Sequence, residues 1–128
     1  MKVKVDPLKS SEYHQAEDLV EGVEYDVLAI EGDRFRVFSQ EGPCRYPKSM
    51  FLITDSSIPE YWVKKSFDDS DEEKWESAWP VEFDYPGFFE DYFDNKPEAI
   101  RIFNAYIEKL GLKPELIVTE EGKLKRVR

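Results

Sequence analysis

The stretch "VEYDVLAIEGDRFRVFS", Val23 to Ser39, decides how this chain folds. Apolar and polar residues alternate through both of its halves, which is the period of a strand with one buried face. Between the halves, "EGD" at 31–33 is a tight-turn signal, because glycine tolerates a positive φ. The stretch therefore predicts a β-hairpin. Its two inner faces carry Val23, Tyr25, Val27 and Ala29 on the first strand and Phe35 and Val37, opposite to Arg34 and Arg36, on the second.

Shorter strand signals flank this hairpin on both sides. "KVKV" at 2–5 alternates valine with lysine, and "CRY" at 44–46 and "FLIT" at 51–54 complete the series. Between the last two, "PKSM" suits one turn of tight helix, since Pro47 presets φ and removes a hydrogen-bond donor. Short strands with regularly spaced turn signals are typical of a small barrel or sandwich.

The segment "GVEYDVLAIEGDRFRVFSQEGPCRYPKSMFLI" resembles an SH3-like barrel of the small bacterial kind. The resemblance lies in a long first loop, two hairpins and "YPKSMF" as the helical turn before the last strand, and it covers residues 1–55. It implies a five-stranded SH3-like β-barrel. With the helices and the terminal hairpin that the patterns beyond it predict, we expect an α+β fold in which residues 56–128 pack against the barrel as one unit. In size and acidity the chain also resembles the immunity proteins that neutralise bacterial toxins.

The sequence from 55 to 80 mixes serine, proline and acids with widely spaced aromatic residues. We expect it to wrap over the barrel as an acidic linker, with "DDSDEE" as a solvated loop and "DEEKWESA", at 71–78, as a short helix. The aromatic residues that we expect to contact the barrel are Tyr61, Trp62 and Phe67.

The stretch "PGFFEDYFD", at 86–94, predicts a second short helix with one apolar side. Four buried aromatic side chains stabilise a fold by about 6–12 kcal/mol gross, which is comparable to the net stability of a whole domain. We therefore assign the rings to a core and the acids to the outer face. The inward set is Phe88, Phe89, Tyr92 and Phe93, and the outward set is Glu90, Asp91 and Asp94. Less regular sequence nearby leaves Trp75, Trp79, Phe83 and Tyr85 as candidates for an exposed aromatic patch.

The clearest helix is "NKPEAIRIFNAYIEKLG", at 95–111. Asn95 and Glu98 have the spacing of an N-cap pair, and Gly111 is placed to end the helix in a left-handed conformation. After it, "ELIVTEEGKLKRVR" predicts a terminal hairpin that turns at Glu121-Gly122.

Charge is distributed unevenly along the chain. The formal net charge is −10; residues 61–98 hold 4 basic and 12 acidic side chains, whereas residues 111–128 hold 5 basic and 3 acidic. The acidic middle would repel phosphates, which disfavours nucleic-acid binding, and would attract a basic protein. An acidity that serves only solubility is the alternative.

Candidate catalytic residues are few. The only histidine, His14, lies in a polar loop beside Glu17 with no nucleophile placed next to it by a motif. The only cysteine, Cys44, follows no reactive-thiol pattern, and we interpret it as an inert side chain of a strand. The sequence therefore predicts no catalytic residue, and it contains no fingerprint for a nucleotide or other cofactor.

A metal site is not predicted either. Asp69, Asp71 and Glu73 have the spacing that opens a calcium loop. The glycine and the bidentate glutamate that such a loop requires are replaced by Lys74 and Pro80.

The N-terminal sequence has no apolar signal core, and no run reaches the ~20 apolar residues of a membrane span. A single cysteine cannot form an internal disulfide. Together these features favour a cytoplasmic protein with no membrane contact, export by a dedicated machine being the alternative.

Our main hypothesis is a non-enzymatic protein that binds a basic partner, such as a toxin, through an acidic face at residues 68–94. A second hypothesis is an adaptor that binds a peptide through Tyr13, Phe35 and Tyr46, and a third is a hydrolase with carboxylates that no motif identifies. The residues expected to bind the basic partner are Asp68, Asp69, Asp71, Glu72, Trp75, Trp79, Glu90, Asp91 and Asp94.

Overall fold

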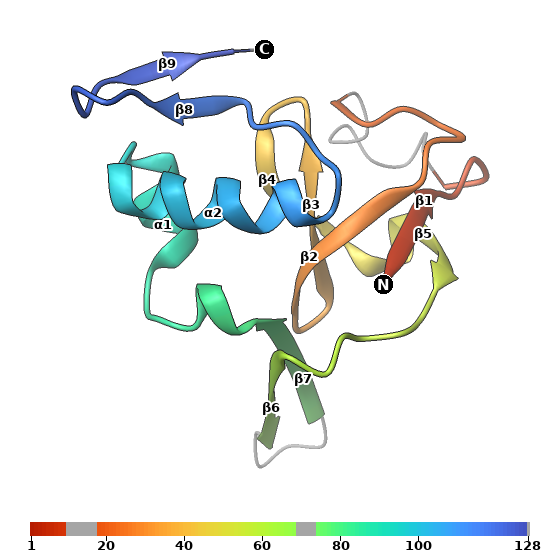
Figure 1. Ribbon diagram of the computed structural model, residues 1–128. Helices are drawn as coiled ribbons and strands as arrows, with labels where there is room; N and C mark the ends of the chain where they lie inside the picture. The colour runs from red at the N-terminus through yellow and green to blue at the C-terminus, as the bar shows by residue number, and fades with distance from the viewer. Residues whose placement is uncertain (10–17, 69–73, 128) are drawn as a thin grey trace. The chain divides into compact units, whose positions relative to one another are not determined.

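The hairpin predicted from residues 23–39 lies in the middle of an antiparallel sheet in a computed structural model (Figure 1). The structure describes residues 1–9, 18–68 and 74–127, without the side chains of 66–68 and 74–76. The fold is α+β, with two compact units, Met1–Pro80 and Val81–Arg128.

The first unit is a sheet in which every pair of neighbouring strands is antiparallel. Five strands follow the order β4-β3-β2-β1-β5, and β7 pairs with both β2 and β6. A single 3₁₀ turn, η3 (Lys48–Met50), separates β4 from β5, so the five predicted strands and the tight helical turn are confirmed. The strands are β1 (Lys2–Val5), β2 (Tyr25–Glu31), β3 (Arg34–Ser39), β4 (Gly42–Pro47), β5 (Phe51–Asp55), β6 (Trp62–Asp68) and β7 (Lys74–Pro80).

A β-bulge changes which residues of β2 face the core. The register with β3 shifts between Val27 and Ala29, so that Val27 pairs with Val37 and Ala29 with Arg36. An extra residue in one strand reverses the alternation beyond it. Ile30 joins Val27 in the main hydrophobic cluster, whereas Ala29 is 1% exposed but does not belong to that cluster. The predicted burial of Ala29 is therefore confirmed, the inward position of Ile30 was missed, and Val23 precedes the strand and is exposed.

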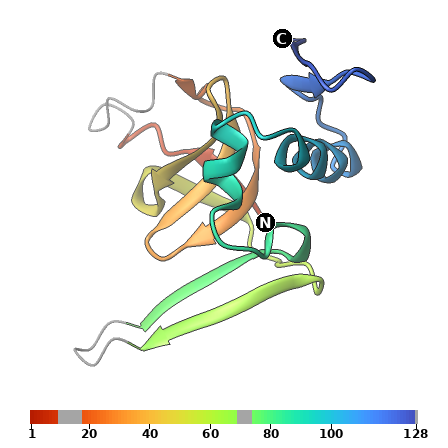
Figure 2. The same cartoon turned by 90° about the vertical axis from the view of Figure 1, so that its left-hand side faces the viewer.

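The hairpin of β6 and β7 corrects the expected helix at 71–78. Trp62 pairs with Pro80 and the register continues to Asp68 opposite Lys74. Figure 2 shows β6 and β7 as two long strands that lie side by side. β7 also pairs with the end of β2, where Ile30 lies opposite Ala78. The backbone of 74–80 therefore completes a sheet, and this hairpin belongs to the first unit and not to the second.

The core of the first unit draws on β1 to β5, on the start of β6 and on Ala78 of β7. Trp62 is 5% exposed within it, as predicted, whereas Tyr61 is 48% exposed and does not serve as a core contact. The side chain of Phe67 lies outside the described residues. The buried members of the cluster are Val3, Val5, Leu19, Val27, Ile30, Phe35, Val37, Tyr46, Met50, Phe51, Trp62 and Ala78.

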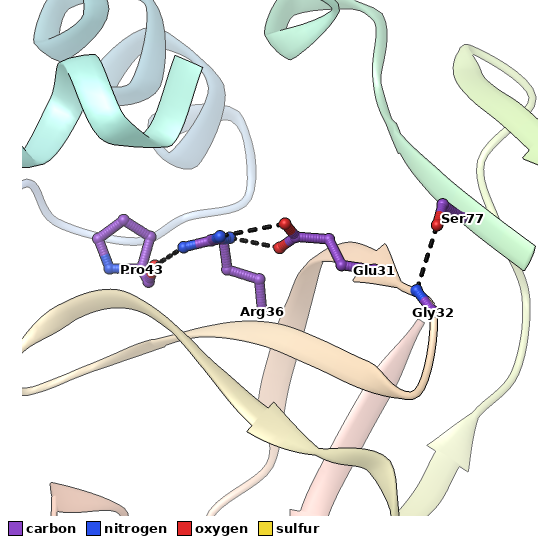
Figure 3. A network of polar contacts seen from close by, with 5 residues as sticks. All are labelled: Glu31, Gly32, Arg36, Pro43 and Ser77. Carbon is purple, nitrogen blue, oxygen red and sulfur yellow. Dashed lines mark hydrogen bonds and ion pairs between the residues drawn. The ribbon is translucent and has the colours of Figure 1, made fainter. Parts of the chain in front are cut away.

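An ion pair lies on the side of β3 opposite to Phe35 and Val37. The Arg36 guanidinium donates from Nε to Glu31 Oε2 at 2.6 Å and from Nη2 to Oε1 at 3.1 Å. Its Nη1 also donates to the carbonyl oxygen of Pro43 at 2.7 Å (Figure 3). Nearby, the Gly32 N–H donates to Ser77 Oγ, which fastens β7 to the β2–β3 turn. The alternation of apolar and polar residues correctly predicted that Arg36 lies on the face of β3 opposite to Phe35 and Val37. It did not predict that Arg36 is only 8% exposed.

The second unit contains two helices and a hairpin. The sheet of the hairpin is two-stranded, with Leu116 opposite Arg126, as predicted. Its turn contains Gly122 at φ 79°, the left-handed conformation that favours glycine. The elements are η4 (Val81–Phe83), α1 (Phe88–Phe93), α2 (Pro97–Lys109), β8 (Leu116–Val118) and β9 (Leu124–Arg126).

Aromatic rings form the core between η4, α1 and α2. Phe88 and Tyr92 are 3% and 2% exposed, in agreement with the predicted inner side of α1. Phe93 is 46% exposed, so its predicted inward position is wrong: it lies five residues after Phe88, and this rotates it away from the buried side. Phe83, expected as an exposed candidate, is buried among these rings.

The junction of the two helices corrects the expected N-cap. Asn95 has φ 60°, a left-handed conformation that asparagine tolerates better than most residues, and it follows the end of α1. The N-cap of α2 is Lys96, which makes no side-chain capping bond. Gly111, at φ 80°, follows α2 as predicted.

Candidate functional site

The outer side of α1 carries three carboxylates, Glu90, Asp91 and Asp94, which we call the acidic arc. Glu90 and Asp94 are four residues apart and therefore share one face of the helix. That face is opposite to the pair Phe88 and Tyr92, which are also four residues apart and are buried. Glu90 and Asp94 are exposed and Asp91 is half-buried. Packing of the aromatic side thus forces the carboxylates into solvent.

The acidic arc has little local compensation. Residues 81–98 contain six acidic side chains and one basic side chain, Lys96. Among the described residues, the three carboxylates of the arc form no ion pair, because the nearby pairs involve Glu82 and Glu98 instead. These two pairs are long, at 4.0 Å to Lys109 and 3.8 Å to Arg101. The arc is therefore a source of negative potential that a basic partner would neutralise.

Two partly exposed rings flank the arc. Tyr85 is 37% exposed and Phe93 is 46% exposed, and each rests edge-on against a buried ring. The pKa of Tyr85 is raised above its usual value, first by partial burial of the phenol and then by the negative charges of Asp91 and Glu98. The charges of both carboxylates therefore act on the phenol. Sequence reasoning did not include Glu98 in the binding residues, because it lies beyond Asn95, in α2.

The other predicted binding residues fall in the first unit. Asp69, Asp71 and Glu72 lie outside the described residues, and only the backbones of Asp68 and Trp75 are described, in β6 and β7. Trp79 is half-buried on β7, with Lys65 Nζ 5.4 Å from its ring centroid. The structure thus groups Glu90, Asp91 and Asp94 on one helix, and the remaining six belong to the β6–β7 segment.

No protein-family model, curated protein or solved structure matches the chain. Its function has to be inferred from the residues and their geometry.

Two of the residues expected on an adaptor surface are buried. Phe35 and Tyr46 are each 2% exposed and pack in the core of the first unit, so their rings cannot line an open groove. Tyr13 lies outside the described residues. Within this core the two residues pack instead against Phe51, at ring-centroid distances of 6.1 Å.

Groups that could support catalysis or bind a metal are sparse. In the part of the chain that the structure describes, no three His, Cys, Asp or Glu side chains lie together as metal ligands would. His14 and the failed calcium-loop residues Asp69, Asp71 and Glu73 lie outside that part. Burial raises the pKa of the Cys44 thiol, which keeps it protonated and a poor nucleophile. No described helix combines the length and apolarity that crossing a membrane requires.

A hydrogen bond of Tyr46 links β4 to the end of the first loop, and this link depends on pH. Its hydroxyl donates a short hydrogen bond to Asp18 Oδ2. Burial of the phenol raises the pKa of Tyr46 well above its usual range, and the Asp18 bond raises it further, because a phenolate cannot donate. The folded pKa is above the unfolded value of about 10, so the stability that this proton provides is complete below about pH 10 and is lost as the pH rises further.

We therefore expect Tyr46 to be absent from the phenolate absorbance of the folded protein in an alkaline titration. The chain has seven tyrosines, and the Tyr46 signal should emerge only with unfolding. Tyr92 and Tyr106 are equally buried and should also ionise late, so Tyr46→Phe should reduce the late step by one tyrosine and leave the earlier titration unchanged. If the late step of Tyr46→Phe is as large as that of the wild type, the assignment to this hydrogen bond is wrong.

Proposed function

We propose that this chain is a non-enzymatic binding protein that docks a basic protein on the acidic arc, with a bacterial toxin as the partner class. The observation that carries the proposal is the exposure of Glu90 and Asp94, which form no ion pair with any described residue, next to the partly exposed rings of Tyr85 and Phe93. Carboxylates attract and orient a basic surface, and aromatic rings at the same place are favoured anchors for binding energy.

We also propose that β1–β5 form an SH3-like barrel that serves as a scaffold and not as a peptide receptor. The strand order β4-β3-β2-β1-β5, the 3₁₀ turn before β5 and a single core shared by all five strands support this proposal. Burial of Phe35 and Tyr46 supports the scaffold role, since groove-type recognition of a peptide requires exposed rings.

Reversing the charge of the arc tests the binding function. The double variant Glu90→Lys, Asp94→Lys changes two exposed residues of the second unit and should leave the fold intact. We expect a basic partner captured from the native host to associate at least about tenfold more slowly with this variant than with the wild type. The wild-type association rate should fall steeply as ionic strength rises.

Glu120→Lys, Glu121→Lys is the matched control. It reverses two exposed acids in the same unit, at the turn between β8 and β9, and gives the same change in net charge. Equal slowing in both double variants would show that net charge, and not the acidic arc, steers the partner. The toxin assignment has its own readout: expression of the captured partner alone should stop cell growth, and co-expression of the wild type, but not of the arc variant, should restore it.

A further inference from the structure

We propose that the outer edge of β9 binds an extended acidic segment of a partner protein as a third strand. This surface is separate from the acidic arc and has the opposite charge. Within the described residues β9 pairs with β8 alone, and all three of its residues are exposed. A two-stranded sheet is only marginally stable in water by itself, and a third strand stabilises it.

The hydrogen bonds of the hairpin show which backbone groups point outward. The Thr119 N–H donates to the Lys123 carbonyl at 2.7 Å, and the Val127 N–H donates to the Glu115 carbonyl at 2.9 Å. In an antiparallel pair, hydrogen-bonded and non-hydrogen-bonded positions alternate. The N–H and C=O groups of Leu124 and Arg126 therefore point away from β8, where an added strand would meet them.

The side chains of this edge select an acidic segment. Lys123 and Lys125 are exposed and, within the described chain, form no ion pair, whereas Arg126 is bound to Glu115 at 3.0 Å. Leu124 is 37% exposed and, by strand alternation, lies on the opposite face from Lys123 and Lys125, where it offers an apolar contact. An extended segment in which acids alternate with apolar residues matches this arrangement in both charge and spacing.

A second copy of the chain does not fit the same edge. Pairing β9 with β9 would place Lys123, Lys125 and Arg126 against one another, and like charges on directly opposed positions are destabilising. The acids of α1 in a second copy are helical and cannot add to a sheet as a strand. Lysines on an edge strand commonly prevent it from pairing with another copy of itself. The same lysines attract an acidic strand, which is therefore the partner that matches this edge.

The test uses the full chain and a fluorescein-labelled synthetic peptide that alternates glutamate with valine. Fluorescence anisotropy should show saturable binding, and a peptide with lysine in place of glutamate should bind at least tenfold more weakly. A third peptide, N-methylated at alternate residues, keeps the charges but cannot form the strand bonds, and it should also bind at least tenfold more weakly. If the N-methylated peptide or a short oligothymidine bound as tightly as the glutamate peptide, simple charge attraction would replace strand addition as the explanation. Failure to detect any binding of the glutamate peptide would overturn the proposal as well.

Protein variants locate the site. Lys123→Glu, Lys125→Glu should weaken binding of the glutamate peptide at least tenfold, and the matched control Lys96→Glu, Lys113→Glu, which also reverses two exposed lysines of the second unit, should not. Equal loss in both would overturn the assignment to β9. The arc variant Glu90→Lys, Asp94→Lys should bind this peptide as well as the wild type does. The β9 proposal can therefore fail while the proposal of a basic partner at the acidic arc holds, and the reverse is also possible.

Discussion

Phe83→Ala is expected to lower the free energy of unfolding of the second unit by about 3–5 kcal/mol. Phe83 is 4% exposed and is the centre of the aromatic core. Its ring stacks on Phe88 at a centroid distance of 4.4 Å and also contacts Tyr106 at 5.0 Å, Phe89 at 5.4 Å and Phe103 at 6.0 Å. Removing it leaves a cavity among rings contributed by two different helices, and rigid rings cannot close such a cavity by small movements.

Urea denaturation followed by far-ultraviolet circular dichroism measures this effect, because the described α-helices, α1 and α2, both belong to the second unit. Phe93→Ala is the control, since it makes the same chemical change on α1 at a ring that is 46% exposed. We expect the control to cost less than about 1 kcal/mol. If Phe83→Ala were as mild as Phe93→Ala, the ring cluster would not be the core of this unit.

The same two phenylalanines show what the sequence could reveal about α1. Spacing of three and four residues predicted the buried pair Phe88 and Tyr92, because these positions share one side of a helix of any length. Phe93 was predicted wrongly because the helix is only six residues long, and the direction in which its last turn points depends on the packing of its neighbours. Phe83 was missed because it precedes α1 in a 3₁₀ turn, where no periodic pattern marks an inner side.

In the first unit, local signals predicted the strands up to residue 55 and failed beyond it. β2 and β3 were found because alternation and a glycine turn lie within one short stretch. β7 was mistaken for part of a helix because the acids at 71–73, immediately before it, are typical of a helix start, and its strand conformation depends on pairing with β6 and with the distant end of β2. Such non-local pairing overrides local propensity and leaves a weak trace in the segment itself.

For the candidate site, sequence reasoning predicted the outer side of α1 but not what surrounds it. The exposed positions of Glu90 and Asp94 follow from the burial of the opposite side. The action of the Glu98 charge on Tyr85 depends on the path of the chain at Asn95, which adopts φ 60°. A left-handed asparagine cannot be distinguished in the sequence from an N-cap asparagine, because both precede a helix start.

Glu31→Ala is expected to lower the free energy of unfolding of the first unit by about 2–4 kcal/mol. The side chains of Arg36 and Glu31 are 10% and 29% exposed, so the pair is far better shielded from water than an ordinary surface pair. Both nitrogens that face Glu31 donate to it, in a two-point contact that aligns the guanidinium with Pro43 (Figure 3). Alanine would leave a buried guanidinium without this carboxylate, and the cost of burying that charge would no longer be offset.

Tryptophan fluorescence reports on this unit alone, because the three tryptophans, Trp62, Trp75 and Trp79, all lie within it. The control is Glu41→Ala, an exposed glutamate of the same unit that forms no ion pair within the described residues. We expect a change of less than about 0.5 kcal/mol for this control. Equal effects of the two substitutions would show that the pair contributes no more than a surface charge does. Partial recovery in the double variant Glu31→Leu, Arg36→Met would identify the buried charge as the source of the loss, since a shielded ion pair can be replaced by apolar side chains of similar size at little cost.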